Sequence, residues 1–440
     1  MALAVAACAP EPAAVTANPD PAALLASAPH TELRERIDNA PKSEIAGEKL
    51  NVELLRRFYA RHGFAPVWTT HKSQADSLVN AVSRADDHGL APELFHANVL
   101  KSPAGLSALD RELLQTDAFL SYADALARGV MPVERRREDE VLKPEEIDVT
   151  ATLDRAIGSA DPSSVIEALA PSTPTYRALR QALHDARAGL PIGGKPAATR
   201  QRDIEVNLER ERWLPRHLPA DRVWVNVADE RVTMYRDHDP VFSSRVVVGQ
   251  TERRNQSPEF QASIDAVWLN PPWVIPQDIV SLEIMPLIKS DPTYLTKHNM
   301  VLLPDGSLQQ VAGANSGLGL LMFDMRNRFD VYLHDTPSKE LFLREDRRIS
   351  HGCIRVEDPQ KLAALLMKQS PDDIKEAIAT SGTVRRTLAK PVPVFVVYET
   401  AFADVDGKLQ FRADAYGRDI EVWQYLHPNQ PAAPERVAHR

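Results

Sequence analysis

A cysteine and two histidines in the last third of the chain have the types and order needed for nucleophilic catalysis. Cys353 directly follows His351 and Gly352, and His334 lies a short distance upstream. A free thiol with a pKa of about 8.5 is only a few per cent ionised at neutral pH, so a cysteine nucleophile needs a histidine to take or hold its proton. A glycine before the cysteine permits the close backbone approach that an oxyanion site requires. This pattern indicates a cysteine nucleophile.

Two other interpretations fit the same residues. A buried free cysteine usually acts only as a small hydrophobic side chain. His334, His351 and Cys353 are also possible zinc ligands, but cysteine-containing zinc sites usually show paired spacings such as Cys-x-x-Cys, which this chain lacks. We therefore expect no metal site, and catalysis remains one of two interpretations of the cysteine.

Short strands must position these residues. Apolar and polar residues alternate over 331–334, which places Tyr332 and His334 on one face of a strand. The surrounding residues 201–425 are predicted to form a mostly β domain. Within it, residues 276–300 have a helical pattern and are predicted to form a flap over a groove.

The prediction of a β domain rests on a change in periodicity. A helix is expected over residues 201–214, after which residues 223–227 alternate with a period of two. The continuous apolar runs 246–248 and 394–397 are typical of strands that are buried on both faces.

Residues 31–189 are predicted to form a helical scaffold domain. The apolar residues within 54–59 share one helix face, and Gly63 supplies the left-handed cap that ends the helix. Ser73 and Asp76 resemble a capping box that would start the next helix. This half of the chain offers no set of residues that could act together in catalysis.

The remaining segments are predicted to be connections and ends. Residues 190–200 have the composition of a linker, and residues 426–440 form a tail. Residues 1–30 begin with an apolar-small-small-Cys sequence that ends at Cys8, followed by an Ala/Pro-rich tether. We interpret this start as a truncated lipoprotein signal, because no Lys or Arg precedes it. An Ala-rich end with an incidental cysteine is the alternative.

Composition excludes two classes of protein. The chain has 440 residues and a formal net charge of −9, and it supplies no basic stripe for binding nucleic acid. No run reaches the roughly 18 apolar residues that a membrane-spanning helix requires.

His334 and Ser350-His351-Gly352-Cys353-x-Arg355 together resemble the active-site signature of L,D-transpeptidases of the YkuD-like type. The resemblance covers residues 30–425 and implies an α+β fold. An N-terminal helical scaffold would precede a mostly β catalytic domain with a helical capping flap. The chain departs from this larger subgroup because only the linker occupies the place of its usual peptidoglycan-binding module. Further similar segments are residues 207–215, 246–249, 270–273, 291–294 and 406–419.

The resemblance implies catalytic roles position by position. Cys353 would be the nucleophile and His334 its general base. His351 and Gly352 would shape the oxyanion site together with the backbone N–H of Cys353. Asp335 is a candidate for orienting His334, but neighbouring side chains of a strand point apart, so a backbone carbonyl is at least as good a candidate.

It also implies roles in substrate binding. Ser350 would hold the turn by hydrogen bonding, while Tyr332 and Trp273 would line the substrate groove. Arg355 would bind a substrate carboxylate or brace the loop. Two simpler alternatives stay open: Arg355 pairs with Glu357, and Trp273 belongs to the hydrophobic core.

The implied activity is that of a peptidoglycan L,D-transpeptidase that forms 3→3 cross-links through a cysteine thioester and is acylated by carbapenems. Its partners would be peptidoglycan stem peptides, without nucleic acid, metal or organic cofactor. The protein would be periplasmic, with a possible lipid anchor through Cys8. Transfer to water or to a lipoprotein lysine, and a non-catalytic wall-binding scaffold, are the alternatives.

Overall fold

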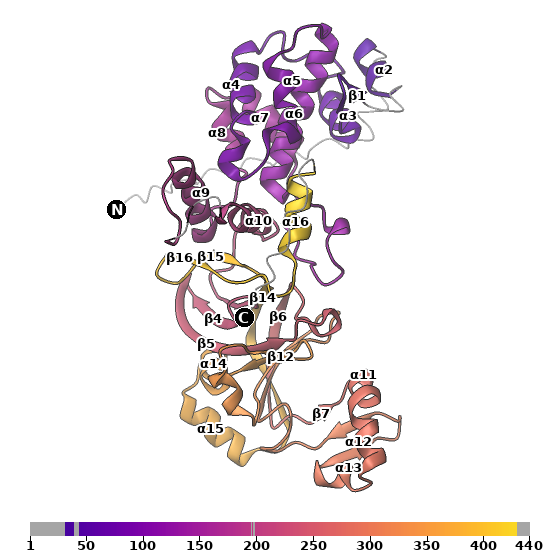
Figure 1. Cartoon of the computed structure of the whole chain (residues 1–440), viewed down its shortest axis with the longest axis vertical. Coiled ribbons are helices and arrows are strands. Elements are labelled where there is room, and N and C mark those ends of the chain that lie inside the picture. Colours follow the sequence, from indigo (N-terminus) through magenta and orange to yellow (C-terminus); the bar gives the residue numbers. More distant parts are fainter. Residues whose placement is uncertain (1–30, 39–43, 195, 197–198, 429–440) are drawn as a thin grey trace, which may run out of the picture. The chain divides into compact units, whose positions relative to one another are not determined.

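The computed structural model describes residues 31–38, 44–194, 196 and 199–428, so the predicted tether with Cys8 and most of the predicted tail lie outside the described residues. The chain divides into two compact units (Figure 1). The first unit comprises the chain up to residue 84 with residues 92–123 and 148–168. The second comprises residues 85–91, 124–147 and everything from residue 169 onward. The predicted arrangement, a helical N-terminal region followed by a β-rich domain, is confirmed.

The first unit is built from helices and one small hairpin. The predicted apolar face over 54–59 is buried, with Phe58 and Tyr59 fully covered. None of the helices in the described part of the chain is both long and apolar enough to cross a membrane. The elements are α2 (Glu32–Asp38), β1 (Glu44–Ile45), β2 (Glu48–Lys49), α3 (Val52–Arg61), α4 (Lys72–Val82), η2 (Pro92–Phe95), α5 (Ala97–Lys101), α6 (Ala108–Arg128, whose last turn belongs to the second unit), α7 (Val149–Ile157) and α8 (Pro162–Glu167).

One predicted helix start is wrong. Helix α4 begins at Lys72 with His71 as its N-cap, and no side chain caps it. Ser73 therefore lies inside the first turn, where its hydroxyl donates to the side chain of Gln74. The Ser-x-x-Asp pattern lies two residues beyond the observed N-cap, because the helix already begins at Lys72.

A nine-stranded sheet dominates the second unit. Its order is β12-β5-β13-β11-β10-β6-β14-β3-β4, and a further pairing of β4 with β5 closes the sheet on itself. Closure of this kind removes most of the exposed strand edge. The strands are β3 (Arg222–Asn226), β4 (Arg231–Arg236), β5 (Asp239–Gly249), β6 (Phe260–Leu269), β10 (Leu321–Met325), β11 (Leu333–His334), β12 (Arg348–Ser350), β13 (Ile354–Val356) and β14 (Val384–Val397).

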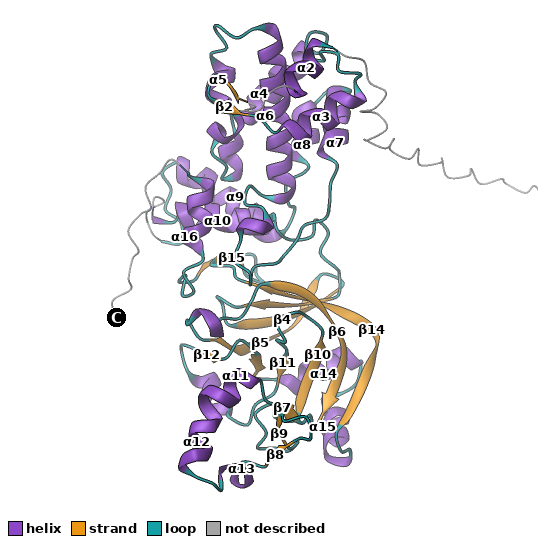
Figure 2. Cartoon of the chain, turned by 90° about the vertical axis from the view of Figure 1, so that its right-hand side faces the viewer, coloured by secondary structure: helices purple, strands orange, loops and turns teal. Residues whose placement is uncertain are grey.

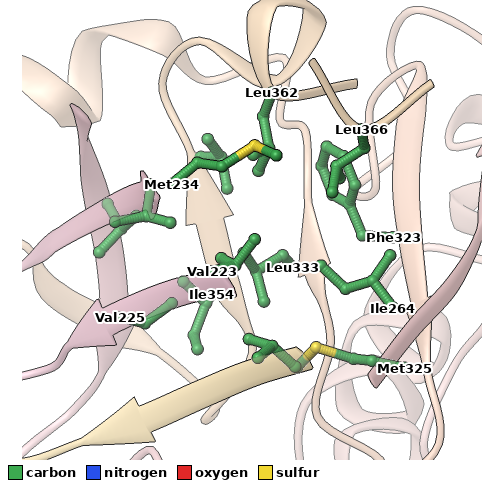
Figure 3. Packing of buried hydrophobic residues seen from close by; sticks show 14 of the residues in the cluster. Val223, Val225, Met234, Ile264, Phe323, Met325, Leu333, Ile354, Leu362 and Leu366 are labelled. Carbon is green, nitrogen blue, oxygen red and sulfur yellow. The ribbon is translucent and has the colours of Figure 1, made fainter. Parts of the chain in front are cut away.

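The core of this unit lies inside the closed sheet and under helix α14 (Pro359–Met367). Figure 3 shows Val223, Phe323 and Leu333 from the strands packed with Leu362 and Leu366 from α14. Helix α15 (Pro371–Thr380) follows α14 and begins with a capping box. The predicted runs 246–248 and 394–397 are buried throughout, as expected for strands covered on both faces.

The predicted flap forms its own small subdomain (Figure 2). Helices occupy the predicted range, and three short strands that were not predicted flank them. Ile275, Val280, Ile284 and Leu308 make a hydrophobic cluster of its own. The elements are β7 (Trp273–Val274), α11 (Gln277–Ile279), the π-helical turn η6 (Val280–Ile284), α12 (Met285–Ser290), α13 (Tyr294–Lys297), β8 (Met300–Leu302) and β9 (Leu308–Gln310).

Residues 124–147 belong to the second unit because buried charges hold them there. Arg418, which is fully buried, contacts Glu259 at 3.0 Å and Glu140 at 3.7 Å, and also binds Asp139 at 2.5 Å. The remaining elements of this unit are η1 (Ala85–His88), η3 (Val133–Arg135), α9 (Pro174–Arg187), α10 (Gln201–Glu211), η5 (Arg253–Asn255), η7 (Lys339–Leu343), β15 (Ala401–Ala403), β16 (Leu409–Phe411) and α16 (Asp419–Leu426).

Candidate active site

The predicted nucleophile and base lie on one face of two paired strands. Strands β11 and β13 run parallel, with His334 opposite Arg355 and Leu333 opposite Ile354. Leu333 and Ile354 are fully buried in the core. Because side chains alternate along a strand, His334, Arg355 and Cys353 lie on the opposite face from this core.

The sulfur of Cys353 lies in a half-buried position beside Tyr332. Burial raises the pKa of the thiol, although a hydrogen bond from the Tyr332 backbone and the positive charge of Arg355 partly offset this effect. The carbonyl oxygen of Asp330 lies 3.9 Å from the sulfur. The resting cysteine is therefore a neutral thiol that needs a base during attack.

His334 can act as that base. Its Nδ1 lies 2.5 Å from the backbone carbonyl oxygen of Asp335. A carbonyl only accepts hydrogen bonds, so Nδ1 carries the proton. The backbone of Leu318 also hydrogen-bonds the ring. Burial, and next the charge of Arg355, lower the pKa of His334 to about 3. The carboxylate of Asp335 is held by the backbone N–H of Leu320 at 2.9 Å and by Lys339 at 2.7 Å. The backbone, not that carboxylate, orients the ring.

A tight turn presents the cysteine. The hydroxyl of Ser350 donates to the carbonyl oxygen of Cys353 at 2.6 Å and accepts from the N–H of Gly352 at 3.2 Å. Gly352 has a φ of +110°, which L-residues rarely adopt. Its carbonyl accepts a hydrogen bond of 2.7 Å from the hydroxyl of Ser257. Ser350 thus occupies the N–H of Gly352, which leaves the Cys353 N–H as the nearest backbone donor for an oxyanion.

His351 points to the flap. Its Nε2 lies 2.6 Å from Oε1 of Glu283 in the turn η6. His351 and Gly352 also line a cavity of about 280 Å³, together with Arg254 and Glu138. Among the described residues, the side chain of His351 therefore connects the catalytic loop, which is the turn of residues 350–353, to the flap.

Arg355 is a partly buried cation whose charge acts on both His334 and Cys353. Within the described part of the chain, no carboxylate pairs with it, and its buried Nε has no hydrogen-bond partner. The alternative partner Glu357 instead binds Arg245, with an Nε–Oε2 distance of 2.9 Å. The guanidinium is thus available to an anionic group that enters the site.

Trp273 and Tyr332 form a hydrogen-bonded pair beside Cys353. The Trp273 indole hydrogen-bonds the Tyr332 hydroxyl, which in turn lies beside Cys353. Burial, followed by the charge of Cys353, raises the pKa of Tyr332, so its hydroxyl stays protonated. Gly317 lies directly against the Trp273 ring, where a Cβ would approach to 3.0 Å. Trp273 is half-buried and packs against the small cluster of the flap, not against the main core.

Two residues of this arrangement were not predicted from the sequence. Ser257 supports Gly352, and Glu283 binds His351. Neither residue has a local pattern that signals its role, because each contact joins segments far apart in the sequence. No group of three or more His, Cys, Asp or Glu side chains among the described residues could hold a metal ion.

Comparisons with known proteins identify two domains in the chain. The family profile of the L,D-transpeptidase catalytic domain, YkuD, matches residues 220–393, and that of the Scaffold domain matches residues 53–183. A Haemophilus influenzae protein named "Putative L,D-transpeptidase" is 27% identical over 417 residues, which cover 86% of this chain and 81% of that relative.

Solved structures were compared as well. One titled "Structure of the Ldtfm-avibactam carbamoyl enzyme" shares 12% identity over 41% of this chain and 49% of its own, with a TM-score of 0.22. The L,D-transpeptidase from Mycobacterium smegmatis shares 14% identity over 40% of this chain and 58% of its own, with a TM-score of 0.22. The chain thus spans about half the length of these two structures. From the two family profiles and the Haemophilus relative, the chain belongs to the L,D-transpeptidase family, with a scaffold domain ahead of its catalytic domain.

Proposed function

We propose that this protein is a peptidoglycan L,D-transpeptidase that forms 3→3 cross-links through a thioester on Cys353. The donor is a tetrapeptide stem whose third residue is a diamino acid and whose fourth is D-alanine. The acceptor is the side-chain amine of the diamino acid in a second stem. Covalent catalysis replaces one difficult amide exchange by two easier steps.

Acylation begins when His334 Nε2 takes the thiol proton as the sulfur of Cys353 attacks the amide carbonyl. The C–S bond forms, the C–N bond breaks, and the protonated His334 gives its proton to the departing D-alanine. A histidine whose pKa lies at about 3 is a weak base, so it takes the thiol proton only as the sulfur attacks, and it returns that proton readily to the amine. The incoming amine then attacks the thioester and gives a proton to His334. The new C–N bond forms, the C–S bond breaks, and His334 passes the proton to the departing sulfur, which restores the thiol.

The observation that supports this proposal most strongly is the fixed tautomer of His334. The hydrogen bond of Nδ1 to the carbonyl of Asp335 commits Nε2 to accepting a proton. The N–H of Cys353 is suited to stabilise the oxyanion. Arg355, which lacks a carboxylate partner within the described residues, suits a carboxylate of the stem peptide.

The flap is suited to exclude water from the thioester. It carries Trp273 over the groove and is joined to the catalytic loop through Glu283 and His351. Water that reached the thioester would hydrolyse it and release a tripeptide. A carboxypeptidase or amidase of the same nucleophile would differ only in this acceptor step, and an enzyme that anchors lipoproteins would use a protein lysine.

Mass analysis of muropeptides tests the proposal. Purified protein is incubated with disaccharide-tetrapeptide, and cross-linked dimers lacking one D-alanine are expected. Tripeptide products without dimers would instead indicate the hydrolytic alternative. Unchanged substrate with the wild-type protein would favour the non-catalytic scaffold, while the Cys353→Ala variant is the control that must yield no product.

The substrate lies outside the cytoplasm, so the proposal includes export to the periplasm, with Cys8 as a possible lipid attachment site. Metabolic labelling with a palmitate analogue tests the anchor. Label on the natural protein that disappears in a Cys8→Ser variant is expected, and an unlabelled wild-type protein would remove the anchor from the proposal.

A further inference from the structure

A second cavity of about 660 Å³ lies in the second unit, on the outer face of the sheet. Strand β3 explains its position. Val223 and Val225 point into the core, so Trp224 and Asn226 between and beyond them face outward. The β15–β16 hairpin supplies another wall through Phe402. None of the residues assigned to the active site lines this cavity.

Flat aromatic surfaces are fixed on its walls. Trp224 packs on the buried ring of Phe395, with ring centroids 5.5 Å apart, and its indole N–H is hydrogen-bonded to Glu399. Trp224 pairs with Thr233 across the ladder, which makes Tyr235 its diagonal neighbour on the same face. The guanidinium of Arg222 lies 3.9 Å from the centre of the Tyr235 ring and holds that ring in place.

Several of the charged side chains around the cavity have partners within it. Arg412 pairs with Asp229 at 2.7 Å. Glu211 and Glu399 are hydrogen-bonded to each other, and their burial raises the pKa of both, so this pair retains a proton. Arg222 stacks on an aromatic ring and donates to a backbone carbonyl. Arg231, Asp239 and Asp404 also line the cavity without an ion pair among the described residues, so charges of both signs remain on the walls and neither sign dominates.

The rest of the lining offers hydrogen bonds. Thr233 and Ser243 present hydroxyls, Gln410 an amide, and the exposed Arg231 a guanidinium that already reaches the Ser243 hydroxyl at 3.0 Å. The volume lies within the range of about 300–1,000 Å³ that is usual for small-molecule sites. Such a site suits a neutral ligand with flat apolar faces and many hydroxyl or amide groups around its edge. A pyranose ring is a ligand of this kind.

We propose that this cavity binds a short segment of neutral glycan, with pyranose rings stacked on Trp224 and Tyr235. The identity of that glycan as the N-acetylated backbone of peptidoglycan rests on the proposed function, whereas the stacking site itself does not. Binding there would hold the enzyme on the wall polymer while the active site handles its peptide. This would supply wall affinity to a chain in which only residues 190–200 separate the predicted scaffold from the catalytic domain.

The test is titration of the full chain with chitotetraose, a neutral β-1,4-linked tetramer of N-acetylglucosamine. The Cys353→Ala variant is used, so that no chemistry occurs. In saturation-transfer NMR, the axial ring hydrogens of the sugar should receive the strongest signal, because they face the aromatic rings. Calorimetry should show affinity weakened about tenfold or more by either Trp224→Ala or Tyr235→Ala. Trp423→Ala, which removes an aromatic outside the cavity, should leave affinity unchanged.

Absence of chitotetraose binding, or equal affinity in the Tyr235→Ala variant, would overturn the proposal. If Trp224→Ala fails to fold by thermal melting, the half-buried Tyr235→Ala variant decides. In a background with Cys353 intact, Tyr235→Ala should still form the carbapenem adduct at the wild-type rate. The two proposals can fail separately. If the protein with Cys353 intact binds the glycan but carries out no peptide chemistry, the proposed function is refuted and the glycan site is not.

Discussion

Oε1 of Glu283 lies 2.6 Å from Nε2 of His351, two residues before Cys353, the proposed nucleophile. Glu283 sits in the π-helical turn η6, an irregularity that often marks functional segments. Both side chains are partly exposed, so this contact contributes only about 0.2–1 kcal/mol. That energy favours a closed flap without preventing a substrate from opening it.

Replacing Glu283 by Gln should change how the thioester is used. A looser flap admits water, so the ratio of free tripeptide to cross-linked dimer should rise by about two- to fivefold. Quantitative separation of muropeptides measures this ratio. Asp278→Asn, an exposed change on the same flap, is the matched control. An unchanged ratio in Glu283→Gln would show that the contact does not govern water exclusion.

The ionisation of Cys353 should be visible in its alkylation by iodoacetamide, which reacts with thiolate. Because burial raises the pKa of the thiol and His334 stays neutral down to about pH 3, the resting pair is not a thiolate–imidazolium pair. The alkylation rate should therefore keep rising from about pH 6 to beyond pH 9. A plateau reached near neutral pH would contradict the neutral pair.

Ser257 should be needed to place the nucleophile. Its buried hydroxyl donates to the carbonyl of Gly352 and accepts from the N–H of Gly249 at 2.9 Å. Ser257→Ala leaves both groups unsatisfied, at a cost of about 1–3 kcal/mol in stability. Acylation by a carbapenem should slow by at least about tenfold, because the turn that presents Cys353 loses its support. The control is Ser281→Ala, on the exposed side of the flap, which should alter neither stability nor rate. A wild-type acylation rate in Ser257→Ala would refute the role of Ser257 in placing Cys353.

Arg418→Ala should destabilise the second unit strongly. Removing this buried cation leaves Glu259 and Glu140 without their partner, at a cost of about 3–5 kcal/mol in the free energy of unfolding. The pKa of Glu140 is already raised to about 7, through burial and then the charge of Glu259. The folded state therefore binds this proton more tightly than the unfolded state, so the variant's stability should improve as the pH falls below 7.

Urea unfolding at about pH 8 and about pH 5.5 measures this difference. The control is Lys361→Ala, which removes an exposed ion pair with Asp358 and should cost less than about 1 kcal/mol. An Arg418→Ala variant that is as stable as this control would show that the buried network contributes little.

Local patterns predicted several elements of the fold. The alternation over 223–227 and the apolar runs 246–248 and 394–397 became strands, because burial of side chains imposes those periods directly on the sequence. The order of His334 and Cys353 was also informative. Strand β11, which contains His334, pairs with β13, which begins directly after Cys353. These predictions depend on residues that are neighbours along the chain or in one motif.

Long-range contacts could not be predicted in the same way. Residues 124–147 fold with the second unit through Arg418, which lies far away in the sequence. Glu283 and Ser257 are likewise defined by partners in other segments. Ser73 shows the converse, because a good local capping pattern was overruled when the helix began at Lys72, two residues earlier than the pattern predicts.

The nucleophilic role of Cys353 is tested most directly by mass spectrometry of the intact protein after incubation with a carbapenem. One added drug mass is expected, mapped by peptide digestion to Cys353, absent from Cys353→Ala and formed much more slowly by a folded His334→Ala variant. An unmodified wild-type protein, or an adduct that persists in Cys353→Ala, would contradict the assignment of Cys353 as the nucleophile.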